Sequence, residues 1–286
     1  MKRLFCMAEA FLLSVCVLVG CNYTDDETEA QVSAADAENN YESAFIVTKA
    51  DTNTNTSEAV RIDLSELDGE CIISEAGSYL LTGTMSGKIL IDAEDQIVHL
   101  ILDDISVRCA SGAALSVMSA GKVIITLNED SVNNLRDSGT YNTDGEENAC
   151  IYSTCDLTFN GLGILNIHGD YKDGIHSKDV VKVLGGDITI QAKRDGIRGN
   201  DGILICGDSL DIESEGTGLH TTKAENEKKG VIEISGGNVS IISGEYAIHS
   251  LGNLCVKDCS IFAKGILSKL RADGDSFIQE ECLKNE

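Results

Sequence analysis

One short motif returns along this 286-residue chain at intervals close to 22 residues. Its pattern, Asp-Gly-Ile-x-small-x-Asp, is complete at residues 173–179 (DGIHSKD) and 195–201 (DGIRGND). Aligned on its aliphatic residue, the motif is found at Leu115, Ile151, Ile175, Ile197, Leu219, Ile248 and Ile266, with successive spacings of 36, 24, 22, 22, 29 and 18. Such a repeat predicts a solenoid, because coil stacking returns the same side chain to the same place in every coil. A sandwich of antiparallel hairpins does not explain it.

Short runs that alternate apolar and polar residues lie between the copies of the motif, for example KVIITL, DITIQA and NVSIIS. Period-two runs separated by Gly, Asn and Asp are typical of strands joined by tight turns. Most repeats contain three such runs, so the sequence predicts an all-β parallel β-helix with coils of about 22 residues. The two longest intervals contain polar segments at 136–147 and 223–229, which we expect to form outward loops.

The N-terminus has the pattern of an export signal. Lys2 and Arg3 precede an apolar run that ends in LVGC at Cys21, and this ending looks like a bacterial lipobox. The run is 16 residues long and contains Glu9, which is short for a membrane-spanning helix. An uncleaved anchor and a plain secretory peptide are the alternatives. We expect lipidation of Cys21 and a monomer that is exported and held, by its lipid alone, to the bacterial cell membrane or outer surface.

These patterns divide the chain into four parts. The predicted boundaries are a lipoprotein signal peptide at 1–20, an acidic flexible tether at 21–56, a parallel β-helix at 57–270 and a C-terminal tail at 271–286 that breaks the repeat.

Charge and cysteine content narrow the classes of partner. With 22 basic and 47 acidic residues, the net charge is −25, which repels nucleic acid and attracts cations. Eight cysteines follow Cys21, none in a CxxC pair. Most lie in apolar runs and are expected to fill the core, although an exported protein permits disulfides. Cys282 lies in the polar tail, so the core interpretation does not extend to it.

Residues 87–107, 112–127, 155–169 and 173–201 resemble exported bacterial carbohydrate-binding domains, which are right-handed parallel β-helices with the shape of pectate lyases. The resemblance covers about residues 60–268. It implies calcium among the coils and affinity for cellulose-like or acidic pectin-like polysaccharides, in a family regarded as binders. The third motif departs from the pattern, because Thr217 and Lys223 stand where the two acids would be. A third ion site is therefore in doubt.

The acids of the doubled motif are the candidate metal ligands. Neighbouring coils lie about 4.8 Å apart, so we expect Asp173 to stack on Asp195 and Asp179 on Asp201. Two carboxylates at that distance repel by roughly 1 kcal/mol in water and by about 3 to 4 kcal/mol at an effective dielectric of 20. A calcium ion for each stacked pair, with help from Asn200, would relieve this repulsion. Alternatively, Asp and Gly simply suit a tight turn without a metal.

Basic residues cluster beside these acids. Lys172, Arg194 and Arg198 are the candidate substrate-binding residues, since an arginine fork next to calcium suits a uronate carboxylate. Local charge balance of the acids is the alternative. His176, His220 and His249 occupy related positions and form either a solvent-facing file or a transition-metal site.

The sequence favours a surface-anchored, calcium-stabilised protein that binds polysaccharide. A calcium-dependent polysaccharide lyase, with Arg194 or Arg198 as the base, is an alternative, and a structural or adhesion solenoid is another. No catalytic residue is assigned.

Overall fold

The computed structural model describes residues 30–33, 42–141 and 145–284. The segment at 1–20 and Cys21 lie outside the described residues, so the signal peptide and the lipidation stay predictions. Within the described part of the chain, no helix is long and apolar enough to cross a membrane.

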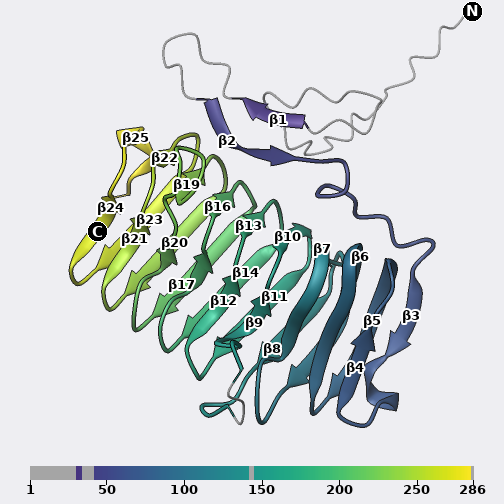
Figure 1. Ribbon diagram of the computed structural model, residues 1–286. Helices are drawn as coiled ribbons and strands as arrows, with labels where there is room; N and C mark the ends of the chain where they lie inside the picture. The colour runs from purple at the N-terminus through teal and green to yellow at the C-terminus, as the bar shows by residue number, and fades with distance from the viewer. Residues whose placement is uncertain (1–29, 34–41, 142–144, 285–286) are drawn as a thin grey trace, which may run out of the picture.

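The strands stack as successive coils, from β3 at one end to β25 at the other (Figure 1). The first coils contain β3 (Val60–Asp63), β4 (Glu70–Ile73), β5 (Gly77–Met85) and the long β6 (Lys88–Arg108), with a 3-10 turn at Leu64–Glu66. From β7 (Leu115–Leu127) onward, each coil places one strand on each of three faces, and every strand pairs in parallel with its equivalent in the next coil. The predicted all-β parallel β-helix is confirmed.

The three faces are named A, B and C. Face A contains the first part of β7, β9 (Ala149–Ser153), β12 (Asp173–Ser177), β15 (Ile197–Gly199), β18 (Leu219–His220), β21 (Tyr246–Ser250) and β24 (Ser268–Ala272). Face B contains the last part of β7, β10 (Asp156–Gly161), β13 (Val180–Val183), β16 (Gly202–Ile205), β19 (Val231–Ile234), β22 (Leu254–Val256) and β25 (Ser276–Ile278). Face C contains β8 (Val132–Arg136), β11 (Ile164–Gly169), β14 (Asp187–Ala192), β17 (Ser209–Ser214), β20 (Asn238–Ser243) and β23 (Ser260–Gly265).

The aliphatic ladder of the repeat lines the core. Ile175 pairs with Ile197, and Ile197 pairs with Leu219; all three side chains are fully buried. The last step differs from the sequence alignment, because Ile248 pairs with Leu270, 22 residues on, and not with Ile266. Ile266 lies in the turn between β23 and β24, where it is 80% exposed. Register with the neighbouring coil therefore decides which residue takes the aliphatic position, and local motif similarity does not.

The glycine of the motif is required by close packing. A Cβ at Gly196 would lie 2.4 Å from Cγ2 of Ile212 and 2.7 Å from the carbonyl oxygen of Gly218. A Cβ at Gly174 or at Gly218 would likewise lie too close to an isoleucine of face C and to a carbonyl oxygen of the next coil. The corresponding residue in the next coil is Ala247, which is fully buried. The Asp-Gly-Ile pattern therefore records where coils approach closely, without any positive φ at these glycines.

The predicted tether is partly wrong. β2 (Glu42–Val47) pairs antiparallel with β1 (Ala30–Ser33), and residues 42–53, here called the strap, cover face B (Figure 1). Phe45 and Val47 pack on Leu204 and Val231. Burial alternates along β2, with Ser43, Phe45 and Val47 on the side that faces the solenoid. The acidic composition of the segment as a whole obscured this short strand.

The predicted C-terminal tail is also partly wrong. β25 pairs with β22 through Leu254 and Ser276, so residues 271–278 complete another coil. A 3-10 turn at Glu280–Cys282 follows, and Leu283 forms a bridge with Ile261. The outermost coil has one neighbouring coil only, so it carries fewer apolar side chains than an inner coil and its sequence does not resemble the repeat.

Candidate functional site

A row of planar and hydrogen-bonding side chains runs across the coils on the outer side of face A. Each follows the inward aliphatic residue by one position and therefore points outward. In register order, this planar file consists of Tyr152, His176, Arg198, His220, His249 and Arg271. Tyr152 and His176 are buried, whereas the members from Arg198 onward are partly exposed, Arg271 most of all.

The exposed part of the planar file is built from stacked planes. The rings of His220 and His249 are nearly parallel, at 10°, with centroids 5.3 Å apart. Tyr246 lies beside His249 at 4.9 Å, and the guanidinium carbon of Arg271 lies 5.3 Å from the centre of the Tyr246 ring. Arg271 Nη1 also donates to the hydroxyl of Tyr246 at 2.9 Å. This end therefore presents flat surfaces with polar edges, which combine apolar contact with hydrogen bonding.

Burial and neighbouring charge affect His249. Burial, His220 and Arg271 lower the pKa of His249, with Asp273 acting in the opposite direction. The imidazole at this position is therefore mainly neutral near pH 7.

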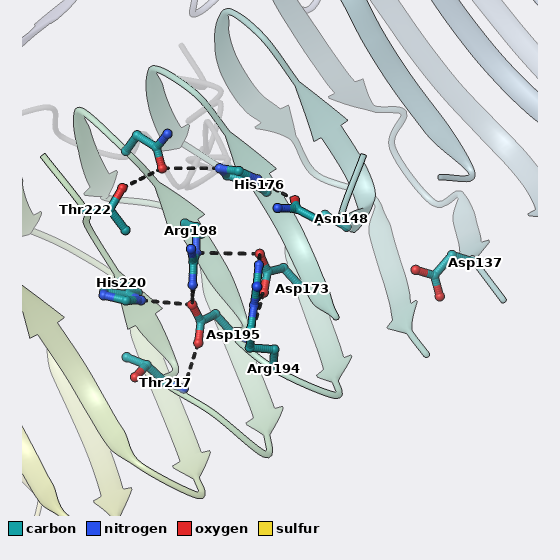
Figure 2. A network of polar contacts seen from close by, with 12 residues as sticks. Asp137, Asn148, Asp173, His176, Arg194, Asp195, Arg198, Thr217, His220 and Thr222 are labelled. Atoms are coloured by element: carbon teal, nitrogen blue, oxygen red, sulfur yellow. Dashed lines mark hydrogen bonds and ion pairs between the residues drawn. The ribbon is translucent and has the colours of Figure 1, made fainter. Parts of the chain in front are cut away.

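The motif aspartates stack as expected, but arginines engage their oxygens. Nε and Nη2 of Arg194 donate to Oδ1 and Oδ2 of Asp173, both at 2.6 Å (Figure 2). Arg198 donates to Oδ2 of Asp195 from Nε at 3.0 Å and from Nη2 at 2.5 Å. His220 Nδ1 lies 2.9 Å from the same oxygen. The sequence had left open whether Arg194 and Arg198 bind substrate or balance the acids, and in the structure both arginines pair with them.

Each of these aspartates also joins one coil to the next. Oδ1 of Asp173 accepts a hydrogen bond from the amide of Asp195 at 3.1 Å, and Oδ1 of Asp195 accepts one from the amide of Thr217 at 3.0 Å. Burial raises the pKa of Asp195, but His220 and Arg198 outweigh it and hold the pKa well below its usual range. The carboxylate is thus ionised and satisfied by protein donors.

The second pair of motif acids has lysine partners. Asp201 Oδ1 lies 2.9 Å from Nζ of Lys223, and its Oδ2 lies 2.9 Å from Nζ of Lys229. Asp179 differs, because burial and the charges of Asp156 and Asp201 raise its pKa, against the opposing effect of the two lysines. The sequence pattern had identified Lys223 only as a missing acid, but it is a partner of Asp201.

The arrangement does not form a calcium cage. Asn200 Oδ1 accepts from the Thr222 hydroxyl at 2.7 Å and lies 3.2 Å from Nε2 of His176. Among residues 30–33, 42–141 and 145–284, no three His, Cys, Asp or Glu side chains are grouped as a metal ion requires. Asp173 and Asp195 do not fit calcium, since arginine, histidine and amide donors already engage their oxygens. Calcium binding stays a prediction, and Asp179 is the candidate carboxyl whose pKa is raised, by burial and by the charges of Asp156 and Asp201.

Lys172 lies at the edge of the site. Its Nζ is 4.7 Å from the centre of the Tyr171 ring, which stacks on Tyr141 at 4.3 Å. The carbonyl of Lys172 accepts from the amide of Arg194, so these two candidates are brought to adjacent coils. An open groove of about 290 Å³ lies alongside, where face C turns into face A, and Asp170, Lys193 and Glu215 contribute to its lining.

The sequence analysis missed three buried acids, which are Asp137, Asp51 and Glu233. Asp137 accepts a hydrogen bond from the Tyr141 hydroxyl at 2.7 Å, and burial together with the charge of Asp170 raises its pKa to about 6. Asp137 lies in the long interval between the motif copies at Leu115 and Ile151, and that interval was the feature of the sequence that could have indicated this site.

The second missed acid belongs to the strap. Asp51 is fully buried beside Lys182 and Lys122, at 3.2 and 3.1 Å, and accepts from Thr158 at 2.7 Å. Burial raises the pKa of Asp51, but the lysines and hydrogen bonds lower it to about 2. No sequence signal marked this residue, because its partners are far away in the chain.

Comparison with known proteins adds independent information. A family model described as "Carbohydrate-binding domain-containing protein" matches residues 67–276. A protein with that description from Acetivibrio thermocellus is 34% identical over 226 residues, which are 77% of this chain and 79% of the relative. A solved structure, described as the polysaccharide lyase-like protein from C. thermocellum in a gadolinium derivative, matches with a TM-score of 0.75 and 28% identity. The match covers 80% of this chain and 99% of that one.

Proposed function

The chain belongs to the family of carbohydrate-binding domain-containing proteins, and from that premise we propose that it binds polysaccharide along the planar file on face A. The planar file itself is the observation that supports this proposal. From Arg198 to Arg271, consecutive coils offer a planar polar side chain in register. An extended glycan laid along the axis of the coils would meet one such side chain about every 4.8 Å.

The charges favour a neutral, cellulose-like chain over an acidic, pectin-like one. Arg198 pairs with Asp195, and Arg271 donates to Asp273 at 2.9 Å, so the file is locally balanced. The whole chain carries a net charge of −25, which repels a polyanion. Hydrogen-bond donors that remain on the partly exposed guanidinium groups would then serve sugar hydroxyls.

Retention of the full-length chain on insoluble cellulose and on calcium pectate gel tests this proposal. We expect retention on cellulose that weakens at least tenfold in H249A and in R271A, about 1.4 kcal/mol. The matched control is T189A, an exposed residue on face C, which should bind as wild type does. Retention on pectate but not on cellulose would mean that the ligand is an acidic polysaccharide and not a neutral one. Absence of retention on either glycan, or equal binding by all variants, would refute the site and favour a structural or adhesion solenoid.

A lyase is the weaker alternative. Proton abstraction by arginine requires a guanidinium that reaches the substrate, whereas Arg194 is held by both oxygens of Asp173. We therefore propose a binder. Incubation with polygalacturonate in calcium should give no ultraviolet absorbance from unsaturated product, and a steady rise in absorbance would overturn this part of the proposal.

We also propose export and lipid anchoring through Cys21, on the basis of the LVGC pattern. Metabolic labelling with a fatty acid should mark the wild-type chain and not C21A. Equal labelling of both chains, or labelling of neither, would contradict the anchor.

A further inference from the structure

The C-terminal end of the solenoid is closed by a short segment. Residues 279–284 fold back under the last coil, where the amide of Lys284 donates to the carbonyl of Ile261 at 2.7 Å. Gln279 Oε1 accepts from the amide of Asp258 at 2.8 Å. We call this segment the cap. It lies against the exposed end of the stack, where unpaired strand edges would otherwise face solvent.

The cap covers apolar surface only loosely. A hollow of about 100 Å³ remains between it and the coil, lined by Ile261, Ala263, Leu270 and Leu283 among others. Leu283 is still 37% exposed. The hydrogen bonds above and this partial packing attach the cap weakly, because segments with few buried apolar contacts open locally at low cost.

Two cysteine side chains meet where the cap contacts the coil. Cys282 belongs to the cap and is 1% exposed, whereas Cys259 lies at the start of the last face C strand and is partly buried. The amide of Cys259 donates to Sγ of Cys282 at 3.4 Å, although the residues are 23 positions apart. Burial and the neighbouring Cys282 thiol raise the pKa of the Cys259 thiol. Both residues are thiols in the structure.

We propose that Cys259 and Cys282 form a disulfide that fastens the cap to the last coil. The 3.4 Å contact between the Cys259 amide and Sγ of Cys282 puts the Cys282 sulfur next to the backbone that carries the Cys259 side chain, which is the proximity that a disulfide requires. Cys282 is the cysteine whose polar sequence surroundings set it apart from the core-filling cysteines. A covalent link at this point would hold the weakly packed cap on the open edge of the solenoid.

The oxidation is balanced by thiol–disulfide exchange with a disulfide-bearing protein oxidase of the extracytoplasmic compartment. The thiolate of Cys259 attacks the disulfide of the oxidase and forms a mixed disulfide, which releases one oxidase thiolate. The thiolate of Cys282 then displaces the second oxidase sulfur and forms the Cys259–Cys282 bond. The protein loses two protons and two electrons, and the oxidase disulfide is reduced to a dithiol. Burial and the neighbouring thiol raise the pKa of Cys259, so exchange is fastest before the cap has closed.

Peptide mapping tests the link directly. The full-length chain is treated with oxidised glutathione, alkylated in denaturant without reductant and digested with trypsin. Cleavage after Lys257, Lys264, Arg271 and Lys284 gives peptides 258–264 and 272–284, each with one of the two cysteines. We expect a cross-linked pair whose mass is lower than the sum of the peptides by two hydrogen atoms. A link between 230–257 and 258–264 would assign Cys255 as the partner instead, and two alkylated peptides would show no disulfide. Either result overturns the proposal.

Thermal melting with and without reductant gives a second readout. Reductant should lower the midpoint of the wild-type chain by about 5 °C and leave C282S and C259S unchanged. The control C109S replaces a buried cysteine near the other end of the solenoid and should keep the response to reductant. If wild type and C282S respond equally to reductant, the disulfide does not fasten the cap.

Discussion

Arg194 holds both oxygens of the Asp173 carboxylate, with Nε to Oδ1 and Nη2 to Oδ2 at 2.6 Å each. The Asp173 side chain is completely buried, while a third of the Arg194 side chain stays exposed. The partly exposed guanidinium thus neutralises the charge of the buried carboxylate. The carboxylate in turn accepts a hydrogen bond from the amide of Asp195 in the next coil.

Replacing Arg194 with alanine should destabilise the protein by about 2 kcal/mol. The substitution removes two charge-assisted hydrogen bonds from a buried carboxylate, and water reaching the corner offsets part of that loss. Urea denaturation measures the change. The matched control is K193A, which removes the exposed ion pair with Glu215 and should leave the urea midpoint close to that of the wild type. Equal losses in the two variants would mean that the Arg194 pair is only a surface contact.

Substitution of Gly196 by alanine should cost about 2 kcal/mol, because the new Cβ overlaps Ile212 and the Gly218 carbonyl in the adjacent coil. The control G139A has open space, with its nearest neighbour, the Asp170 carbonyl, at 3.7 Å. Urea midpoints of the two variants should therefore differ clearly. A tolerated G196A would show that adjacent coils can separate at little cost.

The sequence predicted the features that depend on coil spacing and missed those that depend on contacts distant in the chain. The offset of 22 residues placed Asp173 against Asp195 correctly because a parallel β-helix repeats its register. It could not show that Arg194 and Arg198 would turn back onto those acids, since both arginines have long side chains with several rotamers. The strap was missed because Asp51 and Lys182 are 131 positions apart. Only packing brings them together.

Stability should respond to pH through Asp137. Its pKa is raised from 3.8 to about 6 in the folded protein by burial and by Asp170, with Tyr141 acting in the opposite direction. The folded state therefore binds more protons than the unfolded state, and this contribution to stability is lost as pH rises from about 4 to about 6. The free energy of unfolding of D137N relative to wild type should rise by up to about 3 kcal/mol over that interval. Denaturation series at pH 4, 5, 6 and 7 measure it, and parallel curves for the two proteins would contradict the shift.

We expect calcium to act through Asp179 and not through Asp173. Burial and the charges of Asp156 and Asp201 raise the pKa of Asp179, whereas Asp173 already holds a guanidinium. Calcium at millimolar concentration should raise the melting midpoint of wild type, as any ligand of the folded state does, and D179N should lose the increase. The exposed face C variant D211N serves as the control and should keep it. A wild-type midpoint that does not move with calcium would refute the predicted site.

Loosening the strap should expose it to protease without unfolding the coils. Phe45 is 4% exposed and packs with Val47 on Leu204 and Val231, so F45A removes most of the apolar contact of the strap with face B. We expect trypsin to cleave after Lys49 at least tenfold faster in F45A, while circular dichroism keeps the β signal of the solenoid. Cleavage after Lys228, in the exposed loop at 223–229, is the internal reference and should not change.

The variant D51N tests the polar half of the attachment, since it takes a charged partner from the buried Lys182. The contrary outcome is cleavage of both variants after Lys49 at the wild-type rate. That result would mean that hydrogen bonds to the strap backbone hold it, such as the bond from Lys182 Nζ to the Ile46 carbonyl at 2.6 Å.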